Sequence, residues 1–176
     1  MKKENIEILL KDNGEVLNLK PKSKIIKPDE FNKNFFFIKS GILYQYYIVK
    51  GKKHVFRLIE PNDFCESITI LRGDKNNFEY IETITEVSLI KFDYNKLIKI
   101  MNNNLELSNF FREILEDFLY FQEIRIQKFL SLSPMERYQD FVRENYEKFG
   151  KFSDNIIASY LGMTKESLSR FRNRKS

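Results

Sequence analysis

The stretch from residue 152 to residue 172 most constrains what this chain can fold into, because its positions depend on one another. Asp154 or Ser153 can cap a first helix, and Gly162 follows where that helix must turn through a left-handed backbone. Thr164 can then cap a second helix. Apolar residues recur at helical spacing and give each helix one inward face, namely Ile157, Ala158, Leu161, Leu168 and Phe171. The pattern predicts two short helices that cross closely above the small side chain of Ala158.

The second predicted helix carries a polar and mainly basic outward face. Between residues 164 and 176 there are five basic residues and one acidic residue, which accounts for most of the net charge of +5. Such a cluster is typical of a surface that contacts phosphates, and its side chains can also hydrogen-bond base edges. We therefore predict a helix-turn-helix that binds double-stranded DNA through Thr164, Lys165, Glu166, Ser169, Arg170, Arg172 and Lys175. The alternative is a helical hairpin that only closes a core.

The single histidine and the single cysteine limit the chemistry of the chain. With only His54 and Cys65, an internal disulfide and most zinc or iron–sulfur sites are excluded, so we expect no metal and no cofactor. No Ser/His/Asp set or phosphate-binding loop can be assembled, which makes an enzyme the weakest hypothesis. The chain has 176 residues, of which 42% are hydrophobic and 31% charged, as in soluble proteins with a core. We find no signal peptide and no membrane-spanning run, and expect a cytoplasmic protein without a membrane partner.

The region from residue 14 to residue 93 is predicted to be rich in short strands. Turn signals recur between apolar and β-branched runs, a pattern typical of a barrel or sandwich. Gly51 lies between two such runs and indicates a hairpin. The predicted strands are Glu15–Leu19, Lys24–Lys27, Asn34–Lys39, Ile42–Val49, His54–Ile59, Phe78–Thr85 and Val87–Phe92.

The pattern then changes to helical spacing. Asp93 can cap a short helix, Tyr94–Met101, and a long helix is predicted for Glu106–Leu130. The long helix is apolar over most of its circumference, so it needs two partners. We expect its own β-domain on one side and the same helix of a second subunit on the other, with a dimer interface at Phe111, Ile114, Phe118, Phe121 and Arg125. The alternative is a central helix buried within a monomer.

A break at residues 131–133 separates the long helix from the C-terminal part. Pro134 suits the first turn of a new amphipathic helix, Met135–Phe149, which Gly150 ends. The expected organisation is a β-rich domain over residues 1–104, a dimerisation helix over 105–130 and a helix-turn-helix domain over 131–176, with a hinge at the break.

This order of parts resembles the superfamily of the cyclic-AMP receptor protein and the fumarate–nitrate regulator (Crp/Fnr), over essentially the whole chain. The resemblance is sharpest in the stretches Ser133–Tyr138 and Ile157–Arg170, which look like short members of the family common in the Bacteroidetes lineage. It implies an α+β fold with an N-terminal β-roll (jelly roll) similar to cyclic nucleotide-binding domains, a long dimerisation helix and a C-terminal helix-turn-helix. By analogy, Glu166 would accept from cytosine, Arg170 would donate to guanine, and Lys165 would contact guanine or phosphate.

The expected ligand pocket departs from the family pattern. Relatives that bind cyclic nucleotides use a Gly-Glu pair for the ribose and an arginine pair for the phosphate. Here Cys65, Glu66 and Ser67 occupy the first place, while Lys75 and Asn76 occupy the second. A lone lysine is a poor substitute for an arginine fork, so we predict that cyclic AMP is not the signal. The resemblance leaves the small-molecule effector unknown.

The leading hypothesis is a homodimeric, sequence-specific DNA-binding transcription regulator with a palindromic operator. RNA polymerase is a further candidate partner. The alternative is a small-molecule-sensing or interaction module that has lost specific DNA reading.

Overall fold

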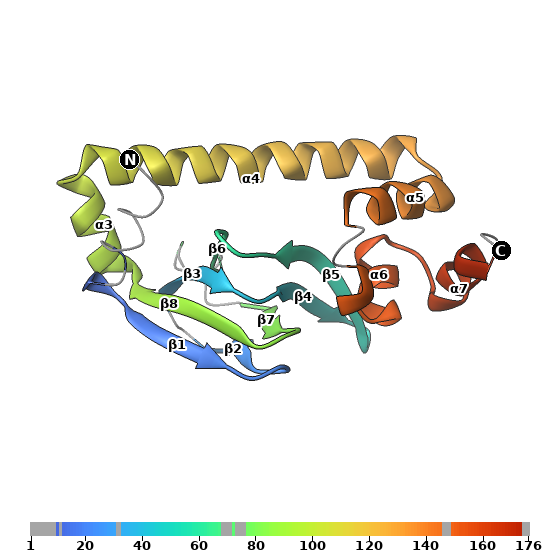
Figure 1. Ribbon diagram of the computed structural model, residues 1–176, viewed down its shortest axis with the longest axis horizontal. Coiled ribbons are helices and arrows are strands. Elements are labelled where there is room, and N and C mark those ends of the chain that lie inside the picture. The colour runs from blue at the N-terminus through green and yellow to red at the C-terminus, as the bar shows by residue number, and fades with distance from the viewer. Residues whose placement is uncertain are drawn as a thin grey trace.

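Figure 1 shows the computed structural model, which describes residues 10, 12–30, 33–67, 72, 77–145 and 149–173. Within these ranges, eight antiparallel strands form two four-stranded sheets, with the orders β1-β8-β3-β6 and β2-β7-β4-β5. The two sheets build a β-roll. The strands are β1 (Glu15–Leu19), β2 (Lys24–Ile26), β3 (Asn34–Ser40), β4 (Leu43–Val49), β5 (Lys52–Ile59), β6 (Phe64–Cys65), β7 (Glu79–Thr83) and β8 (Val87–Asp93).

The helices follow the β-roll along the chain. In Figure 1, α4 extends along one side of the sheets, and α5, α6 and α7 lie together at one end of the molecule. The helices are α3 (Tyr94–Asn102), α4 (Leu105–Ser131), α5 (Pro134–Glu144), α6 (Asp154–Tyr160) and α7 (Lys165–Asn173), with a short 3₁₀ turn at Phe149–Lys151. An α+β fold with a β-roll followed by helices is therefore confirmed.

The hairpin predicted around Gly51 is confirmed. Val49 pairs with Lys52 across the turn, and both turn residues have positive φ, 48° at Lys50 and 75° at Gly51. This is the geometry that joins two twisted strands through two residues. Each predicted strand is present to within three residues at either end, whereas β6 was missed because two residues show no alternation.

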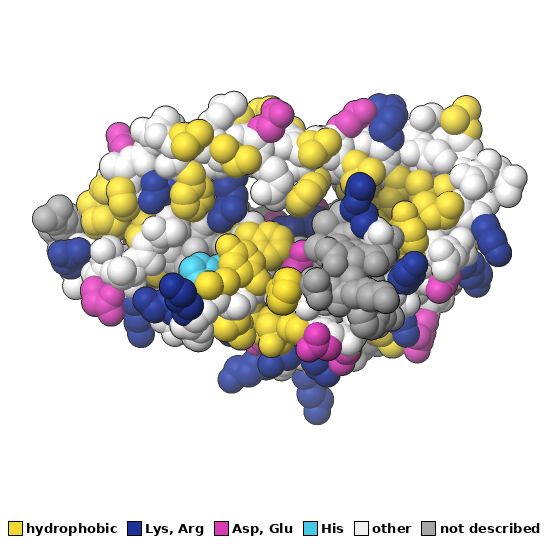
Figure 2. Space-filling model, turned by 180° about the vertical axis from the view of Figure 1, so that it is seen from behind, with side chains coloured by type: hydrophobic (Ala, Val, Ile, Leu, Met, Phe, Trp, Pro, Cys, Tyr) yellow, Lys and Arg dark blue, Asp and Glu magenta, His cyan; other side chains and the backbone are white. Residues whose placement is uncertain are grey.

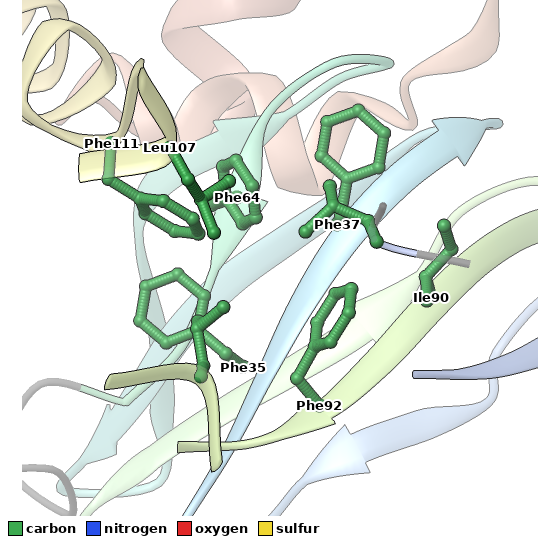
Figure 3. Packing of buried hydrophobic residues seen from close by; sticks show 9 residues of the cluster. Phe35, Phe37, Phe64, Ile90, Phe92, Leu107 and Phe111 are labelled. Carbon is green, nitrogen blue, oxygen red and sulfur yellow. The ribbon is translucent and has the colours of Figure 1, made fainter. Parts of the chain in front are cut away.

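Two clusters of buried side chains form the core of the β-roll. One lies between the sheets and includes Phe36, Ile38, Leu43 and Cys65. The other joins the first sheet to the start of α4 (Figure 3), where the Phe64 and Phe111 rings lie 4.4 Å apart. The expectation that Phe111 lies at a dimer interface is wrong, because its side chain is only 4% exposed and packs inside its own β-roll.

The C-terminal helices share a third core with the β-roll. It contains Phe141 of α5, Ile157 of α6 and Leu168 of α7, together with Ile42 next to β4. The predicted helix Met135–Phe149 is shorter than expected: α5 begins at Pro134 and ends at Glu144, and residues 146–148 lie outside the described part of the chain. A capping box fixes its start, since Ser133 accepts from the Glu136 backbone and Glu136 accepts from the Ser133 backbone.

Candidate functional site

The two C-terminal helices and the turn between them are formed as the sequence predicts. Ser153 is the cap of α6, accepting from the backbone N–H of Ile156, and Thr164 accepts from the backbone N–H of Ser167 at the start of α7. Gly162 has φ of 65°, and a Cβ there would lie 2.5 Å from a ring carbon of Phe129. Gly162 is therefore required both by backbone conformation and by space.

The outward face of α7 is exposed to solvent. Lys165, Glu166, Ser169 and Arg170 are exposed, whereas Leu168 is fully buried. Hydrogen bonds from its own backbone N–H and from the Thr164 hydroxyl hold the pKa of Glu166 below its usual range. The helix thus presents an ionised acceptor beside cationic donors, an arrangement that suits base edges in a major groove.

The remaining expected DNA-contacting residues differ from this set. Arg172 donates to Asp154 of α6, with Nη1 and Oδ1 2.7 Å apart. In this structure Arg172 joins α7 to α6, and its contact with DNA stays a prediction. Lys175 lies outside the described residues.

The exposed apolar side of α4 differs from the expected dimer interface. Ile114 packs against the β-roll core, the Phe118 ring lies under the Arg57 guanidinium, and Arg125 donates to a backbone carbonyl of α6. Of the five expected residues, only Phe121 is exposed. A separate exposed stripe at helical spacing comprises Leu115, Leu119, Ile126 and Leu130. Periodicity missed this stripe because α4 is apolar nearly all round.

A cavity of about 1050 Å³ separates α4 from β5 and extends to α5 and α6. Figure 2 shows the hollow from behind, between the upper helix and the sheet below it. Aromatic rings and arginines line it, among them Phe56, Phe118, Arg57 and Arg137. The middle of α4 is therefore held to the β-roll by few side chains.

In the expected ligand pocket, several polar side chains hydrogen-bond to one another and to the backbone. Gln45 donates to the Glu66 carbonyl at 3.1 Å and to the Glu79 carboxylate at 3.0 Å. The Ser67 hydroxyl donates to the side-chain oxygen of Asn77. The Asn77 amide in turn donates to the backbone carbonyl of Lys27, which follows β2. Cys65 is not a pocket residue, since it is fully buried in the core between the sheets and burial raises its pKa. Lys75 and Asn76 lie outside the described residues.

Glu66 is paired with an arginine that the sequence did not reveal. Arg57 of β5 donates to the Phe64 carbonyl at 2.6 Å and lies 3.8 Å from a carboxylate oxygen of Glu66. Burial raises the pKa of Glu66 to about 7, against the lowering effect of Arg57. The sequence analysis considered only Lys75 and Asn76 in the place of the arginine pair, whereas in the structure β5 supplies an arginine. Its inward position could have been found from the alternation along β5, where Ile59 faces the same side.

Two further properties concern metals and membranes. In the described ranges, no group of three or more His, Cys, Asp or Glu side chains is placed to hold a metal ion. Among the helices of the same ranges, none combines the length and apolarity needed to cross a membrane.

Known structures of the same shape include regulators. A Crp/Fnr-family transcriptional regulator from Thermus thermophilus superimposes with a TM-score of 0.74 at 17% identity, covering 91% of this chain and 84% of the other. The c-di-GMP-responsive global regulator CLP of Xanthomonas campestris gives 0.77 at 13% identity, with coverages of 97% and 90%. A protein from Listeria monocytogenes containing a cyclic nucleotide-binding domain gives 0.76 at 16% identity, with coverages of 99% and 90%.

Sequence comparison gives a family independently of these superpositions. A search of curated proteins found no significant match. Residues 16–104, just over half of the chain and most of the β-roll, match the cyclic nucleotide-binding domain family. The chain belongs to the cyclic nucleotide-binding domain family and shares the fold of the Crp/Fnr transcription regulators.

Proposed function

We propose that this protein is a homodimeric, sequence-specific DNA-binding transcription regulator that is not gated by cyclic AMP. The observation that carries the proposal is the exposed face of α7, where Lys165, Glu166, Ser169 and Arg170 stand on a helix fixed by a buried inner side. Residues 1–104 would sense a signal, residues 105–130 would form the dimer, and residues 131–176 would read DNA as a helix-turn-helix. RNA polymerase is a candidate partner of the DNA-bound protein.

The exposed stripe on α4 supports the dimer. Leu115, Leu119, Ile126 and Leu130 follow one side of the helix, at the spacing of a coiled-coil seam interrupted by Gln122. Pairing of two α4 helices along this stripe would bury all four side chains in a symmetric interface. Two copies of α7 would then meet successive major grooves, about one helical turn apart, on an inverted repeat.

The polar cluster of the β-roll supports an effector other than cyclic AMP. Glu66, which would face a ribose, is already paired with Arg57, and that guanidinium is also bonded to the Phe64 carbonyl. A cyclic phosphate needs a free fork of donors, and Arg57 could supply one only by leaving a carboxylate buried without a partner. The Xanthomonas regulator of the same fold is described as responsive to c-di-GMP, so the fold accommodates other signals.

Random-site selection with the purified protein tests the proposal. The expected result is a selected inverted repeat, bound more tightly than scrambled DNA at every salt concentration tested. Binding to all sequences with equal affinity would contradict it. If the protein then bound a small molecule tightly, a sensing or interaction module without specific DNA reading would be the better description.

A further inference from the structure

The C-terminal end of α6 is held by two arginines from other helices. The last carbonyls of a helix have no partner within it. Arg125 of α4 donates to the Tyr160 carbonyl at 2.9 Å, and Arg137 of α5 donates to the Leu161 carbonyl at 3.1 Å. Both guanidiniums place positive charge where the helix dipole is negative. The turn before α7 is therefore tied to α4 and to α5 at once.

The Phe129 ring joins these two arginines into one cluster. The Arg125 and Arg137 guanidinium carbons lie 4.9 Å and 4.7 Å from its centroid, within the range of cation–π attraction. The ring edge also fills the space that a side chain at position 162 would need. Arg137 donates in addition to the Leu132 carbonyl at 2.7 Å, so a single side chain links the end of α4 to the end of α6.

The middle of α6 is bonded to the β-roll. The Ser159 hydroxyl accepts from the Val55 backbone N–H at 2.8 Å and donates to the Lys53 carbonyl at 2.9 Å. Within the described residues β5 is an edge strand of its sheet, so Ser159 makes the bonds that a neighbouring strand would make. The helix before the turn is thus fixed to the sensor sheet as well as to α4.

These contacts lie at the cavity between α4 and the β-roll, which Arg57 and Phe118 also line. Near its start α4 is held by Leu107 and Phe111 in the core, and the cavity follows along β5. Arg125 is half-buried, so removing its partners would leave a partly desolvated charge without a hydrogen-bond acceptor. A rotation or slide of α4 would have to break this cluster or carry α6 with it.

We propose that Arg125, Arg137 and Ser159 are positioning residues that set the orientation of α7 relative to α4 and β5, and so set the half-site spacing that the dimer reads. The proposal rests on the DNA reading proposed above. None of the three lies on the exposed face of α7. Loosening them should therefore change which spacing is bound while leaving the preference for bases within each half-site intact.

Arg125→Met tests this on the full-length protein, with Arg112→Met as the matched control. Arg112 also lies on α4, but it is exposed and forms an ion pair with Glu116, one turn away on the same helix. The probes are variants of the selected operator whose half-site spacing changes by single base pairs. We expect the wild type and Arg112→Met to favour one spacing, and Arg125→Met to lose about tenfold or more of that preference. An unchanged spacing preference in Arg125→Met would overturn the proposal.

A second variant, Ser159→Ala, and a hydrogen-exchange measurement without DNA test the proposal separately from the stability of Arg125→Met and from DNA binding. Ser159→Ala removes the hydrogen bonds between α6 and β5 and, like Arg125→Met, should weaken the preference for one half-site spacing. Without DNA, amides of residues 157–161 should exchange about tenfold faster in both variants than in Arg112→Met. Faster exchange in a protein that reads no sequence would refute the proposed function but keep the anchoring. Exchange equal to that of the control would refute the anchoring alone.

Discussion

Arg57 of β5 contacts Glu66 and Phe118 on opposite sides of the gap between the β-roll and α4. Its Nη1 lies 3.8 Å from the Glu66 carboxylate, and its guanidinium carbon lies 4.4 Å from the centre of the Phe118 ring. Both charged side chains are nearly buried, at 10% and 11% exposure. Arg57 therefore contacts both the expected ligand pocket and the long helix.

Removing Arg57 should destabilise the fold more than removing both partners. Arg57→Met leaves the Glu66 carboxylate buried without a cation, and we expect a loss of about 3 kcal/mol in the free energy of unfolding. The double variant Arg57→Met/Glu66→Gln should recover most of that loss. Denaturant unfolding of the two single variants and the double variant measures the coupling. A double variant whose loss equals the sum of the losses in Arg57→Met and Glu66→Gln would show that the pair is not coupled.

The pH dependence of stability should carry the signature of Glu66. Its raised pKa of about 7 means that the folded state binds this proton more tightly than the unfolded state. The free energy of unfolding should therefore fall as the pH rises from about 4.5 to about 7, and this contribution should be constant above that range. Arg57 opposes the shift, while Glu79 and Asp63 add to it.

Glu66→Gln isolates this contribution. Subtracting its unfolding free energies from those of the wild type should give a difference curve that changes by on the order of 2 kcal/mol between pH 5 and pH 8. A flat difference curve would mean that Glu66 has an ordinary pKa.

Alanine substitutions at three glycines distinguish the free-energy cost of a strained backbone from the cost of steric overlap. Gly162→Ala faces both, with φ of 65° and the Phe129 ring at 2.5 Å, and should cost about 3 kcal/mol or more. Gly51→Ala has φ of 75° in open space and should cost about 1 kcal/mol. Gly150→Ala meets neither and should be neutral within about 1 kcal/mol. Thermal unfolding of the three variants gives their order of stability. A Gly162→Ala protein as stable as Gly51→Ala would show that overlap with the Phe129 ring adds no cost.

The exposed stripe of α4 should determine the oligomeric state. Leu119→Glu puts a charge in the middle of the proposed seam and should convert the dimer to a monomer with weaker operator binding. Tyr120→Gln is the control, since Tyr120 is equally exposed at about 60% but lies about 100° round the helix. Sedimentation of both variants checks this. If Leu119→Glu stays dimeric, the subunits do not pair through the stripe.

Local structure could be predicted from the sequence where it depends on residues close together in the chain. The Gly51 hairpin, the Asp93 cap and the turn at Gly162 all depend on neighbours a few residues away. Contacts between different elements of the fold could not be predicted in this way. Arg57 reaches Glu66 only because β5 and the end of β6 lie side by side in space, which spacing along the chain does not reveal.

The candidate sites divide in the same way. The polar face of α7 could be predicted because its inner side is marked by Leu168 and Phe171. The exposed apolar side of α4 could not be predicted, because Phe111 and Leu115 are equally apolar and only the packed fold shows that Phe111 faces the β-roll. The part of Arg125 in holding α6 was missed for a related reason: its acceptor is a backbone carbonyl, which sequence does not mark.

The most direct test of the central claim is the affinity of Arg170→Ala for operator variants, compared with the wild type at matched salt. Arg170 is exposed on α7 and donates a hydrogen bond to the Ser167 hydroxyl. We predict that the substitution weakens operator binding by about 1–3 kcal/mol and abolishes discrimination at one base pair in each half-site, leaving the others unchanged. Equal weakening at every position, or full retention of discrimination, would contradict the claim that this face of α7 reads DNA.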